Sequence, residues 1–484
     1  MQLQDPSLLH DRTYVDGQWV GADSGRSFAV RNPANGEEIT QVPDLGAGEV
    51  RRAIEAADKA YPAWRAKTGK ERAAILRRWY DLIMQNQQDL AVLMTSEQGK
   101  ALAESKGEVV YGASFIEWFA EEAKRVYGDV IPQNVGGRRI VVLKEPIGVT
   151  AAITPWNFPI AMITRKVAPA LACGCTSVIK PAKLTPLSAL ALAELAHRAG
   201  VPAGVFNVLT TASASDVGKE LCTNPTVRKV SVTGSTEIGK LVMRLSADTI
   251  KKLSLELGGN APFIVFDDAD LDAAVVGAMA SKYRNSGQTC VCANRILVQD
   301  KVHDAFAEKL AGAVRKLKVG PGLEAGVEQG PLINEAAVEK CEEHIADALG
   351  KGARLVIGGH RHPLGGTFFE PTVLTNANPQ MKIAREEVFG PVAPLFRFDT
   401  EEQAVAMAND TEYGLASYFY SRDIGRIWRV AEALEYGMVG VNEGIISTEV
   451  APFGGVKESG IGREGSKYGI DEYCEVKYVC MGGI

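Results

Sequence analysis

Short β-rich runs alternate with helical segments through the middle of this chain, and this alternation restricts the fold more than any other feature. The expected strands and helices, in chain order, are residues 149–153, 160–173, 177–179, 187–198, 206–209 and 230–232. Regular alternation of this kind predicts a parallel β-sheet that is covered by helices. Ligands of such sheets bind at the carboxyl ends of the strands.

A second series of the same kind begins after Gly258 and Gly259. Its expected elements are residues 263–266, 271–282, 295–298 and 302–317, again strand and helix in turn. A chain of 484 residues is longer than one hydrophobic core organises, so two or three domains are expected. We therefore predict an α/β protein with a domain boundary near residue 257.

Composition argues against several classes of function. The net charge of -6 and the pI near 5.7 give no reason to expect a nucleic-acid partner. No apolar run approaches the length of a membrane span, because Arg165 and Lys166 interrupt the longest one. The N-terminus lacks a secretory signal, and the eight cysteines do not resemble a disulfide framework, so a cytoplasmic location is expected. No metal is expected, because the six histidines form no HExxH motif and Cys173 and Cys175 lack zinc spacing.

A polar segment that begins at Arg284 and contains Gly287 leads directly to Cys290. Glycine permits turn conformations that are closed to other residues, so a side chain after it can point into a cleft. A thiol in such a place is a candidate nucleophile if its thiolate form is favoured. The alternative is an inert cysteine in the core.

Two more side chains are candidates for the chemistry. Glu256 lies within an apolar run, and burial raises the pKa of a carboxyl group toward values that suit a general base. A structural salt bridge is the alternative for Glu256. Asn157 lies in a turn bracketed by Pro155 and Pro159, at the end of an expected strand, where its amide can donate to an oxyanion. A simple turn asparagine is the alternative there.

Two segments are candidates for binding phosphate. Gly234 and Ser235 connect an expected strand to a helix, and the free N–H groups and dipole of a helix start favour a phosphate. Because Thr236 replaces the second glycine of a GxGxxG pattern, a plain strand–helix turn is an equal alternative. Lys180 and Lys183 follow another expected strand and can hold ribose hydroxyls and a phosphate; a solvated lysine pair is the alternative.

Four segments, in this order, resemble the aldehyde dehydrogenase superfamily, and the similarity covers nearly the whole chain. They are Pro155-Trp156-Asn157-Phe158-Pro159, Glu256-Leu257-Gly258-Gly259, Gly287-Gln288-Thr289-Cys290 and Glu387-Val388-Phe389-Gly390-Pro391. The resemblance implies two doubly wound parallel-sheet α/β domains and a small β element for oligomerisation, so homodimers or homotetramers are expected. The implied parts are a dinucleotide-binding domain at 1–256 that includes oligomerisation strands at 124–146, a catalytic domain at 257–445, and a C-terminal return and oligomerisation segment at 446–484.

The resemblance also implies a mechanism. Cys290, as a thiolate, attacks the aldehyde carbon, and the Asn157 amide with the Cys290 backbone N–H resembles the family's oxyanion hole. Hydride then passes to the nicotinamide and leaves a thioester, which water hydrolyses with Glu256 as the base. The positions that match cofactor contacts are Trp156, Lys180, Gly234, Ser235, Leu257 and Glu387, the last at the nicotinamide ribose. Relatives that acylate coenzyme A commonly lack the acid at position 256, so Glu256 argues against that reaction.

Lys183 bears on the choice of cofactor. Relatives that prefer NAD often carry an acid at this position, which binds the ribose hydroxyls and repels a 2′-phosphate. A lysine attracts that phosphate. We therefore expect NADP, with NAD as the alternative.

Within the superfamily, the chain resembles succinate-semialdehyde dehydrogenases. The resemblance rests on residues 162–166, 284, 287–294 and 442–447. Positions that match Arg165, Arg284 and Ser447 hold the far carboxylate of the substrate in that subfamily, and such donors can orient the aldehyde toward the thiol. Glutarate semialdehyde is the alternative substrate, because one methylene is worth only about 1–3 kcal/mol. Cys292 has a family precedent as a redox partner, so a Cys290–Cys292 disulfide that stops the reaction is a further hypothesis.

Overall fold

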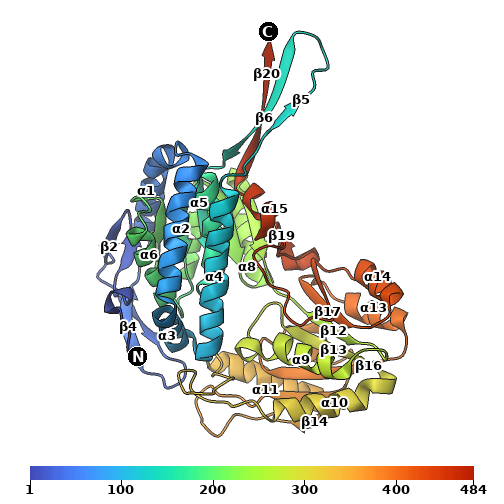
Figure 1. The fold of residues 1–484 in the computed structure, drawn as a ribbon. Helices are drawn as coiled ribbons and strands as arrows, with labels where there is room; N and C mark the ends of the chain where they lie inside the picture. Colours follow the sequence, from blue (N-terminus) through green and yellow to red (C-terminus); the bar gives the residue numbers. More distant parts are fainter.

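The computed structural model describes residues 1–484, and a six-stranded sheet organises its first half (Figure 1). In spatial order its strands are β19 (Gly460–Ile461), β11 (Lys252–Glu256), β10 (Val227–Thr233), β7 (Val149–Ile153), β8 (Thr176–Lys180) and β9 (Phe206–Val208). Neighbouring strands run parallel, except that β19 pairs antiparallel with β11. Every residue of β8 is buried, as expected for a parallel strand that is covered on both faces.

Helices cover both faces of this sheet, and two groups of buried apolar side chains fill the layers between sheet and helices. The helices are α1 (Ala47–Arg65), α2 (Gly69–Gln85), α3 (Gln87–Gln98), α4 (Leu102–Glu122), α5 (Ala161–Cys173), α6 (Leu187–Arg198), α7 (Ala214–Thr223) and α8 (Thr236–Ser246). Two hairpins precede them, formed by β1 (Thr13–Val15) with β2 (Gln18–Val20) and by β3 (Ser27–Arg31) with β4 (Glu38–Pro43). None of the helices is both long enough and apolar enough to span a membrane.

A seven-stranded sheet organises the second half. In spatial order its strands are β14 (Arg354–Ile357), β15 (Thr372–Ala377), β16 (Val392–Phe398), β13 (Ala293–Gln299), β12 (Ala261–Val265), β17 (Ala416–Tyr420) and β18 (Met438–Val441). All pairs are parallel except β14 with β15. Its helices are α9 (Leu271–Lys282), α10 (Asp300–Val314), α11 (Glu335–Gly350), α12 (Lys382–Arg385), α13 (Glu401–Asn409) and α14 (Ile424–Ala433). The predicted α/β class with two mainly parallel sheets is confirmed.

The chain leaves the first sheet at the end of β11 and enters the second at β12, and it returns to the first sheet at β19. After α15 (Ser466–Asp471), the last strand, β20 (Cys474–Gly482), pairs with β6 (Arg138–Pro146), which also pairs with β5 (Asp129–Ile131). These three strands project away from both larger sheets, at the top of Figure 1. Val130 and Val476 on this arm are 79% and 70% exposed, so it presents apolar surface to its surroundings. The domain boundaries at 257 and 446 and the oligomeric state stay predictions.

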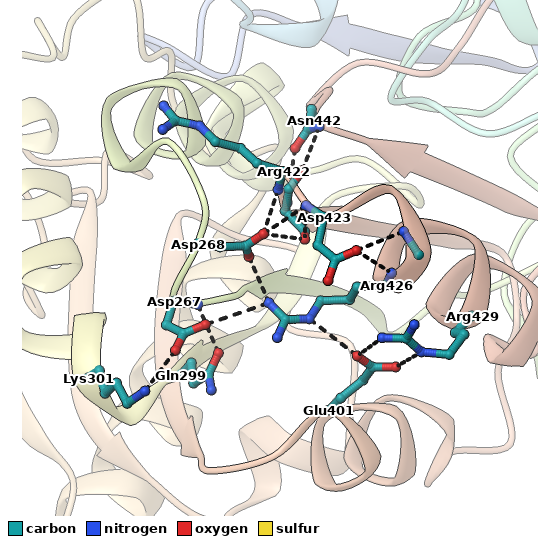
Figure 2. Close-up of polar contacts among 12 residues, drawn as sticks. Asp267, Asp268, Gln299, Lys301, Glu401, Arg422, Asp423, Arg426, Arg429 and Asn442 are labelled. Atoms are coloured by element: carbon teal, nitrogen blue, oxygen red, sulfur yellow. Dashed lines mark hydrogen bonds and ion pairs between the residues drawn. The ribbon is translucent and has the colours of Figure 1, made fainter.

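A network of charges joins α14 to the end of β12 and holds the loop that follows β18 (Figure 2). Asp268 accepts hydrogen bonds from the backbone N–H groups of Arg422 and Asp423, and its other oxygen accepts one from Arg426 at 2.8 Å. Beside it, Asn442 donates to the Ser421 carbonyl at 2.9 Å and accepts from the Ser421 N–H at 3.1 Å. The network therefore fixes the start of the segment that carries Ser447.

Candidate active site

A cleft of about 390 Å³ lies where the strand ends of the first sheet face the loops of the second. Seven predicted site residues line it: Trp156, Asn157, Gly234, Ser235, Leu257, Cys290 and Glu387. They come from five separate parts of the chain, so the fold has brought them together. The other predicted residues lie beside the cleft or outside it, as described below.

The nucleophile candidate follows a strained turn. Asn285 and Ser286 have φ values of 53° and 55°, in the left-handed region that few residues other than glycine adopt. Gly287 has φ 75°, and a Cβ there would overlap the Gly390 carbonyl, so only glycine fits. This turn leaves Cys290 half-buried at the wall of the cleft. Burial raises the pKa of its thiol to about 12, although the positive charge of Arg165 acts in the opposite direction.

Asn157 is buried at the end of β7, and both of its ends contact the cysteine loop. Its side-chain Nδ2 donates to the Gln288 carbonyl at 3.0 Å, and its Oδ1 is buried without a hydrogen-bond partner. Its backbone carbonyl accepts from Lys100 Nζ at 2.6 Å and from Asn285 Nδ2 at 3.0 Å. The carboxamide therefore lies beside the backbone just before Cys290, and its second N–H remains available to a ligand.

Glu256 ends β11, and both of its carboxylate oxygens are buried without a hydrogen-bond partner. Burial raises its pKa well above the usual range, and the nearby Glu464 adds to the increase, while Arg165 and Lys166 oppose it. An unpartnered buried carboxylate costs stability, and such groups gather at functional sites. The alternative of a structural salt bridge does not describe Glu256, because no cation is bonded to it.

Glu464, which the sequence did not single out, holds two cations beside Glu256. It accepts from Arg165 Nε at 2.7 Å and from Lys166 Nζ at 2.5 Å, and all three side chains are buried. Burial disfavours the charge of Glu464, but the two cations outweigh burial and lower its pKa to about 2. Arg165 also packs over the Phe453 ring at 4.0 Å. The guanidinium that was predicted to bind substrate is therefore already committed to an ion pair.

Arg284 and Ser447 line one small cavity, which they share with Tyr418. Arg284 forms no ion pair with a carboxylate; its guanidinium lies over the Phe158 ring, 5.1 Å from the centroid. The hydroxyl of Tyr111 is buried without a hydrogen-bond partner. Burial raises its pKa, and the charges of Arg165 and Arg284 oppose the increase. Sequence reasoning missed Tyr111, because a lone tyrosine on an amphipathic helix carries no signal.

The other end of the cleft has the features of a phosphate and ribose site. Ser235 caps α8, and its hydroxyl accepts from the Ile238 N–H. A Cβ at Gly234 would meet nothing nearer than 3.9 Å, so no protein contact requires a glycine there. The Thr233 hydroxyl is buried without a partner, and burial raises the pKa of Glu387 to about 8. Polar groups without protein partners therefore lie beside the uncrowded backbone at the start of α8. This arrangement fits the phosphates and ribose of a nucleotide cofactor.

The two lysines lie outside the cleft lining. Lys180 is buried at the end of β8, donates to the Pro181 carbonyl at 3.1 Å, and has its pKa lowered to about 8 by burial. Lys183 is exposed and lines a separate cavity of about 280 Å³ with Glu97 and Leu184. The structure therefore does not bring Lys183 to the same cleft as Cys290.

Cys292 is buried, and its thiol lies 3.7 Å from the Lys282 carbonyl. All eight cysteines, including Cys290, are free thiols. No group of three or more His, Cys, Asp or Glu side chains has a geometry that could hold a metal ion.

Comparisons with known proteins identify the family of the chain. The model of the aldehyde dehydrogenase family matches residues 19–479. The chain is 66% identical to glutarate-semialdehyde dehydrogenase of Pseudomonas aeruginosa, over 100% of both chains. It is 65% identical to the NADP-dependent succinate-semialdehyde dehydrogenase GabD of Escherichia coli, again over 100% of both. It is also 65% identical to 3-sulfolactaldehyde dehydrogenase of Pseudomonas putida, over 100% of this chain and 99% of the relative.

Solved structures have the same fold as this chain. The crystal structure of succinate-semialdehyde dehydrogenase from Burkholderia pseudomallei superposes with a TM-score of 0.99, at 65% identity over 100% of both chains. An NADP-dependent enzyme of E. coli gives the same score at 64% identity, over 99% of this chain and 100% of that one. The chain therefore belongs to the aldehyde dehydrogenase family and is an enzyme that oxidises aldehydes.

Proposed function

We propose that this enzyme oxidises a short aldehyde that carries an anionic group at its far end, with succinate semialdehyde as the first candidate and succinate as its product. The observation that carries the proposal is Arg284, a half-buried guanidinium without a carboxylate partner that shares a cavity with Ser447. An arginine left free in this way suits a ligand carboxylate. The Tyr111 hydroxyl is also buried without a partner, and the charge of Arg284 acts on it.

The names of the relatives support an anionic substrate and leave its identity open. Succinate semialdehyde, glutarate semialdehyde and 3-sulfolactaldehyde are all short aldehydes with a carboxylate or sulfonate at the far end. Glutarate semialdehyde is the second candidate, because a relative of that name is 66% identical over the whole chain. One methylene changes binding by only about 1–3 kcal/mol, so both can be substrates.

In the proposed mechanism Cys290 attacks the aldehyde carbon as a thiolate. The S–C bond forms while the carbonyl electron pair moves to oxygen, and the resulting oxyanion accepts hydrogen bonds from the Asn157 amide and the Cys290 backbone N–H. Asn157 Nδ2 donates only one hydrogen bond, to the Gln288 carbonyl, so its second N–H is free to serve this purpose. Arg284 and Ser447 hold the far carboxylate, which orients the aldehyde toward the sulfur.

A nicotinamide cofactor held in the cleft would supply the hydride acceptor for oxidation of the thiohemiacetal on Cys290 to a thioester. Gly234 and Ser235 at the start of α8 would hold its phosphates, and Glu387 its ribose, with Trp156 and Leu257 at further contacts. Lys180, at the end of β8, lies outside the cleft lining and would be reached only by a part of the cofactor that extends beyond it. NADP is the first candidate, because the GabD relative is named for that cofactor. The exposed Lys183 lies outside the cleft lining, so it would attract a 2′-phosphate only at an end of the cofactor that extends beyond the cleft. NAD is the alternative.

Glu256 completes the reaction by taking a proton from the water that attacks the thioester carbon. The C–S bond then breaks, the carboxylic acid leaves, and the Cys290 thiol is restored. Both oxygens of Glu256 are free of partners, so either can accept the water proton. The raised pKa of Glu256 makes it a stronger base than an exposed glutamate.

Steady-state assays test the proposal. They compare NADP with NAD, and succinate semialdehyde and glutarate semialdehyde with uncharged aldehydes of matched length. We expect the highest kcat/KM with succinate semialdehyde and NADP. Equal kcat/KM values for charged and uncharged aldehydes would contradict carboxylate binding by Arg284 and Ser447. A preference for NAD would contradict only the role of Lys183 in cofactor choice.

A further inference from the structure

A buried ion pair lies directly beneath the Asn157 turn. Lys100, between α3 and α4, is 2.6 Å from Glu108 of α4, and each side chain is only 1% exposed. The same ammonium group donates to the Asn157 carbonyl at 2.6 Å and lies over the Phe158 ring, 4.0 Å from the centroid. No other charged side chain forms a hydrogen bond with the backbone of Asn157. The ion pair therefore contacts the candidate oxyanion donor on its buried side.

Glu108 fixes the segment that follows Asn157. Its second oxygen accepts hydrogen bonds from the backbone N–H groups of Ile160, at 2.9 Å, and Ala161, at 3.2 Å, at the start of α5. A carboxylate is well placed there, since the helix dipole and the unpaired N–H groups both favour negative charge. Lys100 and Glu108 therefore hold the turn from Asn157 to α5 at both of its ends.

Residues 98–104, which include Lys100, also form hydrogen bonds with the loop that precedes Cys290. Gln98 donates to the Asn285 side-chain oxygen at 3.0 Å, and Glu104 accepts from the Asn285 N–H at 2.8 Å. Asn285 in turn donates to the Asn157 carbonyl at 3.0 Å. The left-handed conformation of Asn285 persists only if its surroundings enforce it, and these bonds do so.

The Asn157 carbonyl is therefore the point where the two halves of the candidate site meet. It accepts one hydrogen bond from Lys100 and one from Asn285, which belongs to the cysteine loop. A pair of buried charges adds little net stability compared with an apolar pair of similar volume. Its clear effect here is geometric, because it sets the distance between the carboxamide and the thiol.

We propose that Lys100, neutralised by Glu108, is a positioning residue that sets the Asn157 carboxamide against the oxyanion that forms at Cys290. The inference rests on the proposed oxyanion role of Asn157. Misplacement of a catalytic group by 1 Å can cost about a hundredfold in rate. Replacing Lys100 should therefore lower kcat by about 10–100-fold, with little change in KM for the aldehyde.

A double-mutant cycle of Lys100→Met with Asn157→Ala tests the proposal on the full-length enzyme. If Lys100 acts through Asn157, Lys100→Met lowers kcat in the parent but causes no further loss in the Asn157→Ala background. The rate of Cys290 alkylation by iodoacetamide stays within about twofold of the parent, since the thiol itself is not altered. Lys309→Met, which removes a surface partner of Asp272, is the matched control and keeps full activity.

The double variant Lys100→Met/Glu108→Leu keeps the test valid if Lys100→Met alone does not fold, because it removes both buried charges together. This double variant should fold but keep a low kcat, since methionine at position 100 cannot donate a hydrogen bond to the Asn157 carbonyl. Equal losses of kcat from Lys100→Met in both backgrounds, or full activity of the double variant, would overturn the positioning role alone. Full activity of Asn157→Ala would overturn the oxyanion role of Asn157 together with this inference.

Discussion

Replacement of Arg284 by methionine should remove the preference for an anionic substrate and leave the fold intact. Arg284 is half-buried and forms no ion pair, so its loss breaks no salt bridge. Its charge also acts on the Glu104 carboxylate, which keeps the charge of Lys100 and the hydrogen bond from the Asn285 N–H. Its contact with the Phe158 ring is worth only about 0.5–1 kcal/mol at an exposed site. The situation of Arg165 is different, because its removal would leave Glu464 with a single buried cation.

The size of the effect follows from the interaction that is lost. A hydrogen bond to a charged group contributes about 1.5–3 kcal/mol, and 1.4 kcal/mol corresponds to a factor of 10. The ratio of kcat/KM for succinate semialdehyde to that for butanal should therefore fall by about 10–150-fold in Arg284→Met. Most of the decrease should be in kcat/KM for succinate semialdehyde, since butanal has no group that binds the guanidinium.

Initial rates of reduced cofactor formation, measured by absorbance with both aldehydes, give this ratio directly. Arg284→Lys keeps the charge but not the two-pronged geometry, so its ratio should fall between those of the parent and Arg284→Met. Thermal unfolding should show little change in either variant. The reasoning is refuted if Arg284→Met lowers kcat/KM for both aldehydes by the same factor, because that result describes a disturbed active site and not a lost carboxylate contact.

Three more predictions concern the thiols and the cofactor. In the cofactor-free enzyme, the rate of Cys290 alkylation should rise by about tenfold per pH unit up to pH 9, because burial raises the pKa of the thiol and only the thiolate reacts; a plateau near neutral pH would contradict this. Lys183→Glu should lower the NADP/NAD ratio of kcat/KM by about 10–100-fold, since an acid repels the 2′-phosphate, and an unchanged ratio would remove Lys183 from cofactor selection. Cys292→Ala should lose less activity in hydrogen peroxide than the parent does, as measured by residual activity and thiol titration, and equal sensitivity would count against the disulfide with Cys290.

The sequence predicted most of the fold because apolar spacing is a local signal. The helices at 187–198 and 271–282 and the strand at 149–153 have the predicted bounds. The strand predicted at 230–232 extends to Val227–Thr233, since apolar spacing does not mark where backbone pairing ends. The return of β19 to the first sheet depends on contacts some 200 residues apart, and nothing in the local pattern indicates them.

The candidate site was predicted only in part for the same physical reason. Cys290, Asn157 and Glu256 lie in segments that resemble family motifs, and the structure brings the first two to one cleft with Glu256 nearby. The ion pair of Arg165 with Glu464 joins residues that are 299 positions apart, so the sequence could suggest the arginine but not its partner. Lys100 carries no motif, and its importance follows only from its contact with Asn157.

Trapping the acyl-enzyme tests the central claim most directly. Glu256→Gln keeps the shape of the side chain but removes the base, so thioester hydrolysis should become the slow step. After incubation with succinate semialdehyde and NADP, mass spectrometry of the denatured variant should find a succinyl group on the peptide that contains Cys290. The reduced cofactor should appear as a burst of about one equivalent per active site. Continued full turnover of Glu256→Gln, or the absence of a succinyl group on Cys290, would contradict the account.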